Sequence, residues 1–134
     1  MRLVEINPLD VQRVFPSFYH KDSQFFVITY KDNEVGIYGI KTIDLKVCEI
    51  SLCIFEDYRY KLPYKTGLKL LLKFPFTLNF VRIMISTVEK SIITLLRQCQ
   101  SLGVEFVGYD KGNPKKVWFK MTRKAGNNVG KENG

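Results

Sequence analysis

Residues 47–108 decide the fold: they read VCEISLCIFEDYR (47–59), then TGLKLLLKF (66–74), VRIMISTV (81–88) and EKSIITLLRQCQSLGVEFVG (89–108). Runs rich in β-branched residues alternate here with runs whose leucines and isoleucines recur every three or four positions. This alternation predicts strand, helix, strand, helix and strand. Strands joined by a helix usually pair in parallel, so we expect a partly parallel sheet in this part of the chain.

More strands are predicted on both sides of this stretch. A first helix should begin at Asn7-Pro8 and run to about Phe18, because Asn suits the cap and Pro the first helical position. Aromatic and β-branched runs predict the strands. They are expected at Arg2–Ile6, Gln24–Tyr30, Val35–Lys41, Leu45–Phe55, Phe80–Thr87, Val104–Tyr109 and Val117–Met121.

The second and third helices carry their own start and stop signals. The second should open at Lys65 or Thr66 and end at Pro75, since proline breaks a helix interior. Ser86-x-x-Glu89 has the spacing of a capping box for the third, and Gly103 suits its C-terminal end. The fold class is therefore α/β, a mixed α+β sheet of about seven strands covered by three helices. One domain is expected over residues 1–121, followed by a basic, disordered tail at 122–134.

Composition favours a compact domain that is neither exported nor inserted in a membrane. The chain has 134 residues, 46% of them hydrophobic, and a mean hydropathy of -0.09. It contains no apolar run of about 18 residues and no N-terminal signal pattern, so a cytoplasmic location is the expectation. The three cysteines and single histidine show no metal-ligand spacing. Reduced, structural thiols are expected, and Cys48 and Cys53 should face opposite sides of their strand.

The chain is basic, with a net charge of +8. Much of the excess lies in residues 107–134, which hold seven lysines and arginines against one aspartate and one glutamate. This bias permits a nucleic acid, an anionic cofactor or an acidic protein as partner, and it equally suits a solubilising surface.

The order and spacing of these elements, with Leu102, Gly103 and Gly108, resemble the acyl-CoA-binding half of the GNAT superfamily of N-acetyltransferases. The resemblance spans roughly residues 20–109, and within the family the chain is similar to short, divergent members encoded by tailed bacteriophages. It implies acetyl-CoA as cofactor, with its pantetheine arm along strand 47–55 and its pyrophosphate at the helix start near Gly67. It implies an amine-bearing small molecule or protein as the acceptor.

Glu49 is the candidate general base. On the strand, Val47, Glu49, Ser51 and Cys53 share one face, which suits a cleft, whereas Cys48, Ile50, Leu52 and Ile54 share the core face. The family often places its base at this point, where it takes a proton from an ammonium group directly or through water. Glu56 is the second choice. Alternatively, Glu49 is an exposed residue or is paired with a nearby lysine.

The resemblance assigns Ser51, Cys53, Arg59, Lys61, Lys65, Thr66 and Gly67 to the cofactor. The family carries glycines in the loop before the helix, where the backbone approaches phosphate. Here Lys61, Leu62, Pro63 and Tyr64 replace them, so side-chain charge from Arg59, Lys61 and Lys65 would have to substitute. The same residues also fit an ordinary solvated basic loop.

The family's catalytic asparagine and tyrosine fall on Ile92 and Cys99. Cys99 is therefore the candidate proton donor, with Tyr60, Tyr64 and Tyr109 as unranked alternatives. Three functions remain open. The first is acetyl transfer to a primary amine. The second is a catalytically degenerate phage protein that contacts virion structural proteins. The third is a basic nucleic-acid module that uses the aromatic residues interleaved with lysine at 58–65.

Overall fold

The computed structural model describes residues 1–59 and 61–123. These residues form one seven-stranded sheet with three helices. The strands are β1 (Arg2–Ile6), β2 (Ser23–Tyr30), β3 (Asn33–Asp44), β4 (Val47–Ile54), β5 (Arg82–Thr87), β6 (Val104–Tyr109) and β7 (Val117–Thr122). The helices are α1 (Pro8–Val14), α2 (Tyr64–Thr77) and α3 (Lys90–Arg97), with short 3₁₀ turns at Glu56–Tyr58 and Gln100–Leu102. The predicted mixed sheet with three helices is confirmed.

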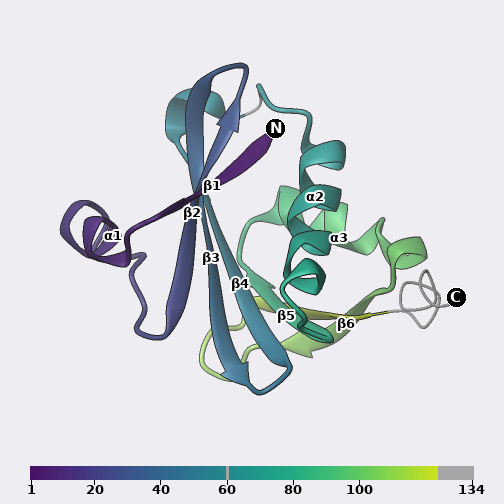
Figure 1. Ribbon diagram of the computed structural model, residues 1–134. Helices are drawn as coiled ribbons and strands as arrows, with labels where there is room; N and C mark the ends of the chain where they lie inside the picture. The colour runs from purple at the N-terminus through teal and green to yellow at the C-terminus, as the bar shows by residue number, and fades with distance from the viewer. Residues whose placement is uncertain (60, 124–134) are drawn as a thin grey trace, which may run out of the picture.

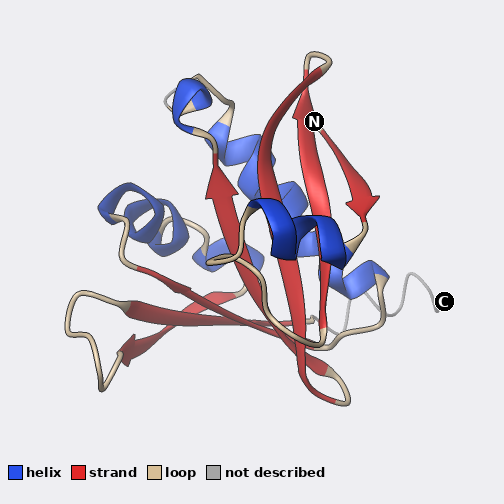
Figure 2. Cartoon of the chain, turned by 90° about the vertical axis from the view of Figure 1, so that its left-hand side faces the viewer, coloured by secondary structure: helices blue, strands red, loops and turns tan. Residues whose placement is uncertain are grey.

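The sheet has one parallel pair, at the place the sequence predicted it. Its order is β1-β2-β3-β4-β5-β7-β6. β4 and β5, which α2 connects, run parallel, and every other neighbouring pair is antiparallel. Figure 2 shows that the strands at the two ends of the sheet cross at a large angle, as right-handed sheet twist accumulates.

The helices lie on opposite sides of the sheet. α1 is on one side, beside β1 and β2, while α2 and α3 are together on the other (Figure 1). The main core joins α2 and α3 to the sheet through residues such as Leu72, Leu96 and Phe119, all almost fully buried. A smaller core of Val11, Phe25 and Ile37 lies under α1.

Burial alternates along β5 and β7, so the two faces of the sheet differ there. Ile83 and Ile85 of β5 are buried, whereas Arg82 is exposed and Met84 is half-buried. We call the side packed on α2 and α3 the helix face and the other side the open face. Strand register assigns the open-face residues. They are Val47, Glu49, Ser51 and Cys53 of β4, Arg82, Met84 and Ser86 of β5, Trp118, Lys120 and Thr122 of β7, and Glu105 and Gly108 of β6.

The prediction that α2 ends at Pro75 is wrong. The helix begins at Tyr64 and continues through Pro75 to Thr77. Proline has no N–H, so the carbonyl of Leu71, four residues earlier, loses its helical donor. The buried Tyr38 hydroxyl donates to that carbonyl oxygen at 2.6 Å. A residue of β3 therefore repairs the defect that the proline creates.

Other helix boundaries also differ from the prediction. α1 ends at Val14 rather than near Phe18. The capping box is absent because Ser86 belongs to β5, and Glu89 is instead the residue before α3 and makes no side-chain cap. The backbone N–H of Glu89 donates to the Thr87 hydroxyl at 3.1 Å. α3 ends at Arg97 rather than at Gly103, which has φ 96° and ends the following 3₁₀ turn instead.

The sheet is tightly packed behind β4. A side chain on Gly36 would bring its Cβ to 2.5 Å from the carbonyl oxygen of Cys53, so only glycine fits there.

All three cysteines are free thiols. The predicted tail falls mostly on residues 124–134, which lie outside the described residues. None of the helices described is long and apolar enough to cross a membrane.

Candidate functional site

β4 and β5 separate partway along their length. They pair only where Val47–Ile50 runs beside Arg82–Ile85. Beyond this point β4 stays paired with β3, and β5 with β7, so the two strands follow diverging halves of the twisted sheet. The β4 residues Ser51–Ile54 therefore have an edge without a strand partner, facing the C-terminal end of β5.

A cleft of about 600 Å³ fills this gap. Its volume is within the range of about 300–1,000 Å³ that is usual for sites of small molecules and cofactors. Its walls are mainly apolar, with a few hydroxyl and charged groups. They comprise Tyr38, Ile50–Ile54, Arg59, Tyr64, Leu68, Leu71, Ile85–Thr87, Glu89, Ser91, Ile92 and Thr94–Leu96.

Residues that project to both faces of the sheet contribute to the walls of the cleft. Ser51 and Ser86 line it from the open face, and Leu52 and Ile85 line it from the helix face. Two molecules could thus meet between the strands, one entering beside α2 and α3 and the other arriving over the open face.

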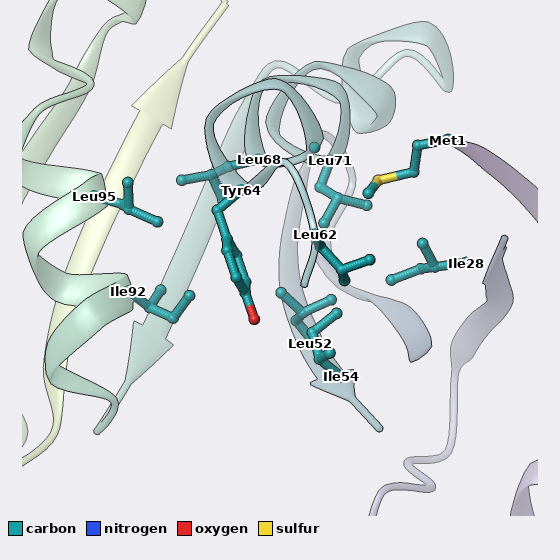
Figure 3. A pocket seen from close by; sticks show the side chains of 11 residues that line it. Met1, Ile28, Leu52, Ile54, Leu62, Tyr64, Leu68, Leu71, Ile92 and Leu95 are labelled. Carbon is teal, nitrogen blue, oxygen red and sulfur yellow. The ribbon is translucent and has the colours of Figure 1, made fainter. Parts of the chain in front are cut away.

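Tyr64, the first residue of α2, lines the cleft on the helix face. Figure 3 shows its ring between Ile92 of α3 and Leu52 and Ile54 of β4, with the hydroxyl pointing away from α2. A second cavity, of only about 20 Å³, lies behind it and is lined by Leu62 among other residues. Leu62 does not line the large cleft, and Tyr64 is one of the residues that form its walls.

The first turn of α2 presents backbone donors near the cleft. The N–H of Gly67 donates to the Pro63 carbonyl at 2.9 Å, which is the first helical bond. Lys65 and Thr66 precede it in the first turn, where N–H groups have no partner within the helix. Such a terminus favours anions, although Pro63 itself contributes no donor.

The structure brings together some of the predicted cofactor residues. Ser51, Cys53 and Arg59 line the cleft. Gly67 is buried against Met1 and lines the small cavity instead. The other three candidates, Lys61, Lys65 and Thr66, are exposed at or before the start of α2 and do not form the walls of the cleft.

Glu49 lies on the open face, just below the point where the strands part. It is half-buried and does not line the cleft. In the strand register it lies opposite Lys41 on β3 and Met84 on β5. Ser51, the next open-face residue on β4, lines the cleft about 7 Å further along the strand. Within the described residues, the Glu49 carboxylate forms no salt bridge and no hydrogen bond.

Cys99 follows α3, and its thiol donates to the Leu95 carbonyl at 3.1 Å. Burial raises the pKa of this thiol, and the positive charge of Lys69 partly opposes the effect. Cys99 does not line the cleft. Of the tyrosines named as alternatives, Tyr64 lines it, Tyr109 is exposed on β6, and position 60 is not described.

No protein-family model and no curated protein matches this sequence. Solved structures do match. A dodecameric spermidine N-acetyltransferase from Vibrio cholerae has a TM-score of 0.68 at 13% identity, covering 99% of this chain and 97% of that one. A Bacillus subtilis acetyltransferase in complex with CoA has a TM-score of 0.66 at 15% identity, over 92% and 97%. An IAA acetyltransferase from Bacillus cereus has a TM-score of 0.65 at 15% identity, over 90% and 98%.

The chain has the GNAT fold. At these identities the likeness shows the architecture and leaves the chemistry to the residues themselves. The strand-loop-helix unit that the sequence singled out, from β4 to α2, borders the cleft.

Several cleft residues were not predicted. Ser86, Thr87, Glu89, Ser91 and Thr94 contribute the polar groups of the β5 and α3 wall. Their signal was present in part, because a parallel β4–β5 pair places the segment after β5 opposite the end of β4. The described residues contain no cluster of three or more histidine, cysteine, aspartate or glutamate side chains suited to a metal ion.

Proposed function

We propose that this protein is an N-acyltransferase that moves an acetyl group from acetyl-CoA to a primary amine. The observation that carries the proposal is the unpaired β4 edge, Ser51–Ile54, which lines a cleft of about 600 Å³. The acetyltransferases with this fold, one of them solved with CoA, support the proposal.

The residues present fit an acyl-CoA donor. An extended, amide-bearing chain can pair with the free backbone groups of β4 as an added strand would. The apolar side chains Leu52, Leu68 and Ile92 would contact its methylene groups. At the entrance, Arg59 and the first-turn N–H groups of α2 would bind the pyrophosphate.

Acetyl-CoA supplies an acyl group activated as a thioester, and the chain must manage two protons. The acceptor arrives as an ammonium ion, and Glu49 takes its proton directly or through one water so that the neutral amine can attack. A C–N bond then forms as the C–S bond breaks. The departing sulfur takes a proton from a donor of the chain, and that donor is reprotonated by the second proton that the nitrogen loses. The proton acceptor and the proton donor should therefore both lie near the point where β4 and β5 separate.

Two residues are candidates for the second proton transfer. Cys99, which the sequence predicted, carries a thiol that donates a hydrogen bond to the Leu95 carbonyl. It does not line the cleft. Tyr64 is one of the residues that line the cleft. Contact with the cleft favours Tyr64 as the donor.

Calorimetric titration of acetyl-CoA into the full chain tests the proposal. Ile92→Trp fills the cleft from the α3 side without altering charge, whereas Lys90→Trp places the same side chain on the exposed start of α3. We expect binding by the wild type and Lys90→Trp, and loss of at least tenfold in affinity for Ile92→Trp. No binding by the wild type, or equal binding by all three proteins, would contradict the donor site.

The absence of the family's usual side chains at Ile92 and Cys99 supports a second candidate, a GNAT-fold protein without catalysis. The concrete form of that candidate is a phage protein that contacts virion structural proteins. It predicts no release of CoA from acetyl-CoA with any amine, even where the titration detects binding.

A further inference from the structure

A row of aligned side chains crosses the open face beside the gap. Strand register pairs Lys41 with Glu49, Glu49 with Met84, Met84 with Lys120, and Lys120 with Glu105. Paired residues on neighbouring strands project to the same face. The row therefore runs cation, anion, methionine, cation, anion from β3 to β6.

The two inner charges of this row are available to a ligand. Glu49 is in no salt bridge or hydrogen bond with the residues described. Lys120 has its ion pair with Glu105 at 3.9 Å, and the two side chains are 41% and 62% exposed. An exposed pair at this distance is weak, so Lys120 can exchange its partner at little cost.

The spacing of these charges fits a short molecule. β4 and β7 lie two strand spacings apart, so the backbones at Glu49 and Lys120 are about 10 Å apart. Met84 lies between them as an apolar floor. Because both charged side chains can lean over this floor, a ligand that bridges them needs its own opposite charges only a few bonds apart.

The charge balance opposes a polycation. Arg82, the next open-face residue of β5, is exposed beside the row and adds a third cation to Lys41 and Lys120, against two carboxylates. The chain as a whole carries +8. A polyamine would meet net repulsion here and lack carboxylates for its additional ammonium groups, whereas an anionic group would be attracted.

We propose that the acceptor is a small amino carboxylate, an amino acid or short peptide, and that a polyamine is a poor substrate. Its ammonium group lies at Glu49 next to the gap, and its carboxylate lies at Lys120 across Met84. This inference rests on the proposed acyltransferase function. It makes Lys120 a determinant of acceptor specificity.

The test compares kcat/KM for a panel of amino acids and glycyl dipeptides, each beside its own carboxamide, together with spermidine. The full chain is used with acetyl-CoA, and release of free CoA is followed. The best carboxylate acceptor should exceed its carboxamide, and spermidine, at least tenfold. Lys120→Gln should raise KM for the carboxylate acceptor and so bring the ratio close to one. Arg82→Gln should lower the ratio less. Lys73→Gln, the same change on the exposed side of α2, should leave the ratio intact.

A carboxamide or spermidine that reacts as well as the carboxylate overturns the inference, and so does a ratio that both open-face variants leave unchanged. Turnover of none of these acceptors also overturns it. In that case acetyl-CoA binding in the same preparation shows that only the acceptor assignment has failed. Absence of both binding and turnover shows that the proposed function has failed.

Discussion

At the scale of single residues, Glu49 is the side chain on which the proposed chemistry depends most. Glu49→Gln keeps the shape of the residue and removes its basicity, so kcat should fall by about 10²–10⁴-fold. Affinity for acetyl-CoA should not change, because Glu49 does not line the cleft. Glu34→Gln, at the exposed start of β3, is the matched control. Steady-state rates with unchanged kcat in Glu49→Gln would exclude it as the base.

Tyr64 and Cys99 can be separated in the same assay. If Tyr64 protonates the departing sulfur, Tyr64→Phe should lower kcat by about 10²-fold. Cys99→Ser, which keeps a donor for the Leu95 carbonyl, should have little effect. The reverse result, a large loss only in Cys99→Ser, would favour the assignment made from the sequence.

Trp118 reports on the open face, since it is the only tryptophan in the chain. Its indole N–H donates to the Asp110 carboxylate at 2.9 Å, and the Lys116 ammonium lies 5.3 Å from its ring centre. The indole bond, and then the bond from the Gly112 N–H, lower the pKa of Asp110. A lowered pKa means that these bonds stabilise the fold above the ordinary aspartate pKa and are lost as pH falls through the lowered value.

Tryptophan fluorescence between neutral and acid pH should therefore change with a midpoint below the ordinary aspartate value of 3.8. Asp110→Asn should lack this transition, and far-UV circular dichroism recorded in parallel separates it from acid unfolding. A wild-type midpoint at or above the ordinary value would show that the indole bond does not hold Asp110 ionised.

At the scale of elements, α2 depends on a residue far from it in sequence. Tyr38 donates to the carbonyl that Pro75 leaves without a partner. Tyr38→Phe should lower the free energy of unfolding by about 1–3 kcal/mol, the usual cost of leaving a buried group unpaired. In a Pro75→Ala background the backbone N–H of Ala replaces the hydroxyl, so the same change should cost less.

Urea unfolding of the wild type, Tyr38→Phe, Pro75→Ala and the double variant measures the coupling energy between the two positions. A coupling energy near zero would mean that the hydroxyl does not compensate for the proline.

The element boundaries show what local sequence could and could not predict. Asn7-Pro8 was placed correctly, because capping is decided by a few adjacent residues. Gly103 does adopt the left-handed conformation, but it ends the 3₁₀ turn Gln100–Leu102 and not α3. The end of α2 was misplaced because the compensating Tyr38 is 33 residues away from Leu71. The Ser86 capping box failed because pairing with β7 keeps Ser86 in a strand.

At the scale of the whole molecule, the order of elements predicted the sheet, and the one parallel pair followed from it. The cleft itself was less predictable. Its existence depends on how far β4 and β5 diverge, which the local sequence does not fix. Ser51, Cys53 and Arg59, which the sequence predicted as cofactor residues, line the cleft, whereas the α3 wall was read only as the apolar side of a helix.

The central claim is that an acyl-CoA donor pairs with the free edge of β4. Titration of CoA into ¹⁵N-labelled protein, followed by amide chemical shifts, tests it most directly. We expect the largest shifts at Ser51–Ile54, with further shifts at Lys65 and Thr66, and almost none on β1. Shifts that leave Ser51–Ile54 unmoved, or no shifts at millimolar CoA, would contradict the account.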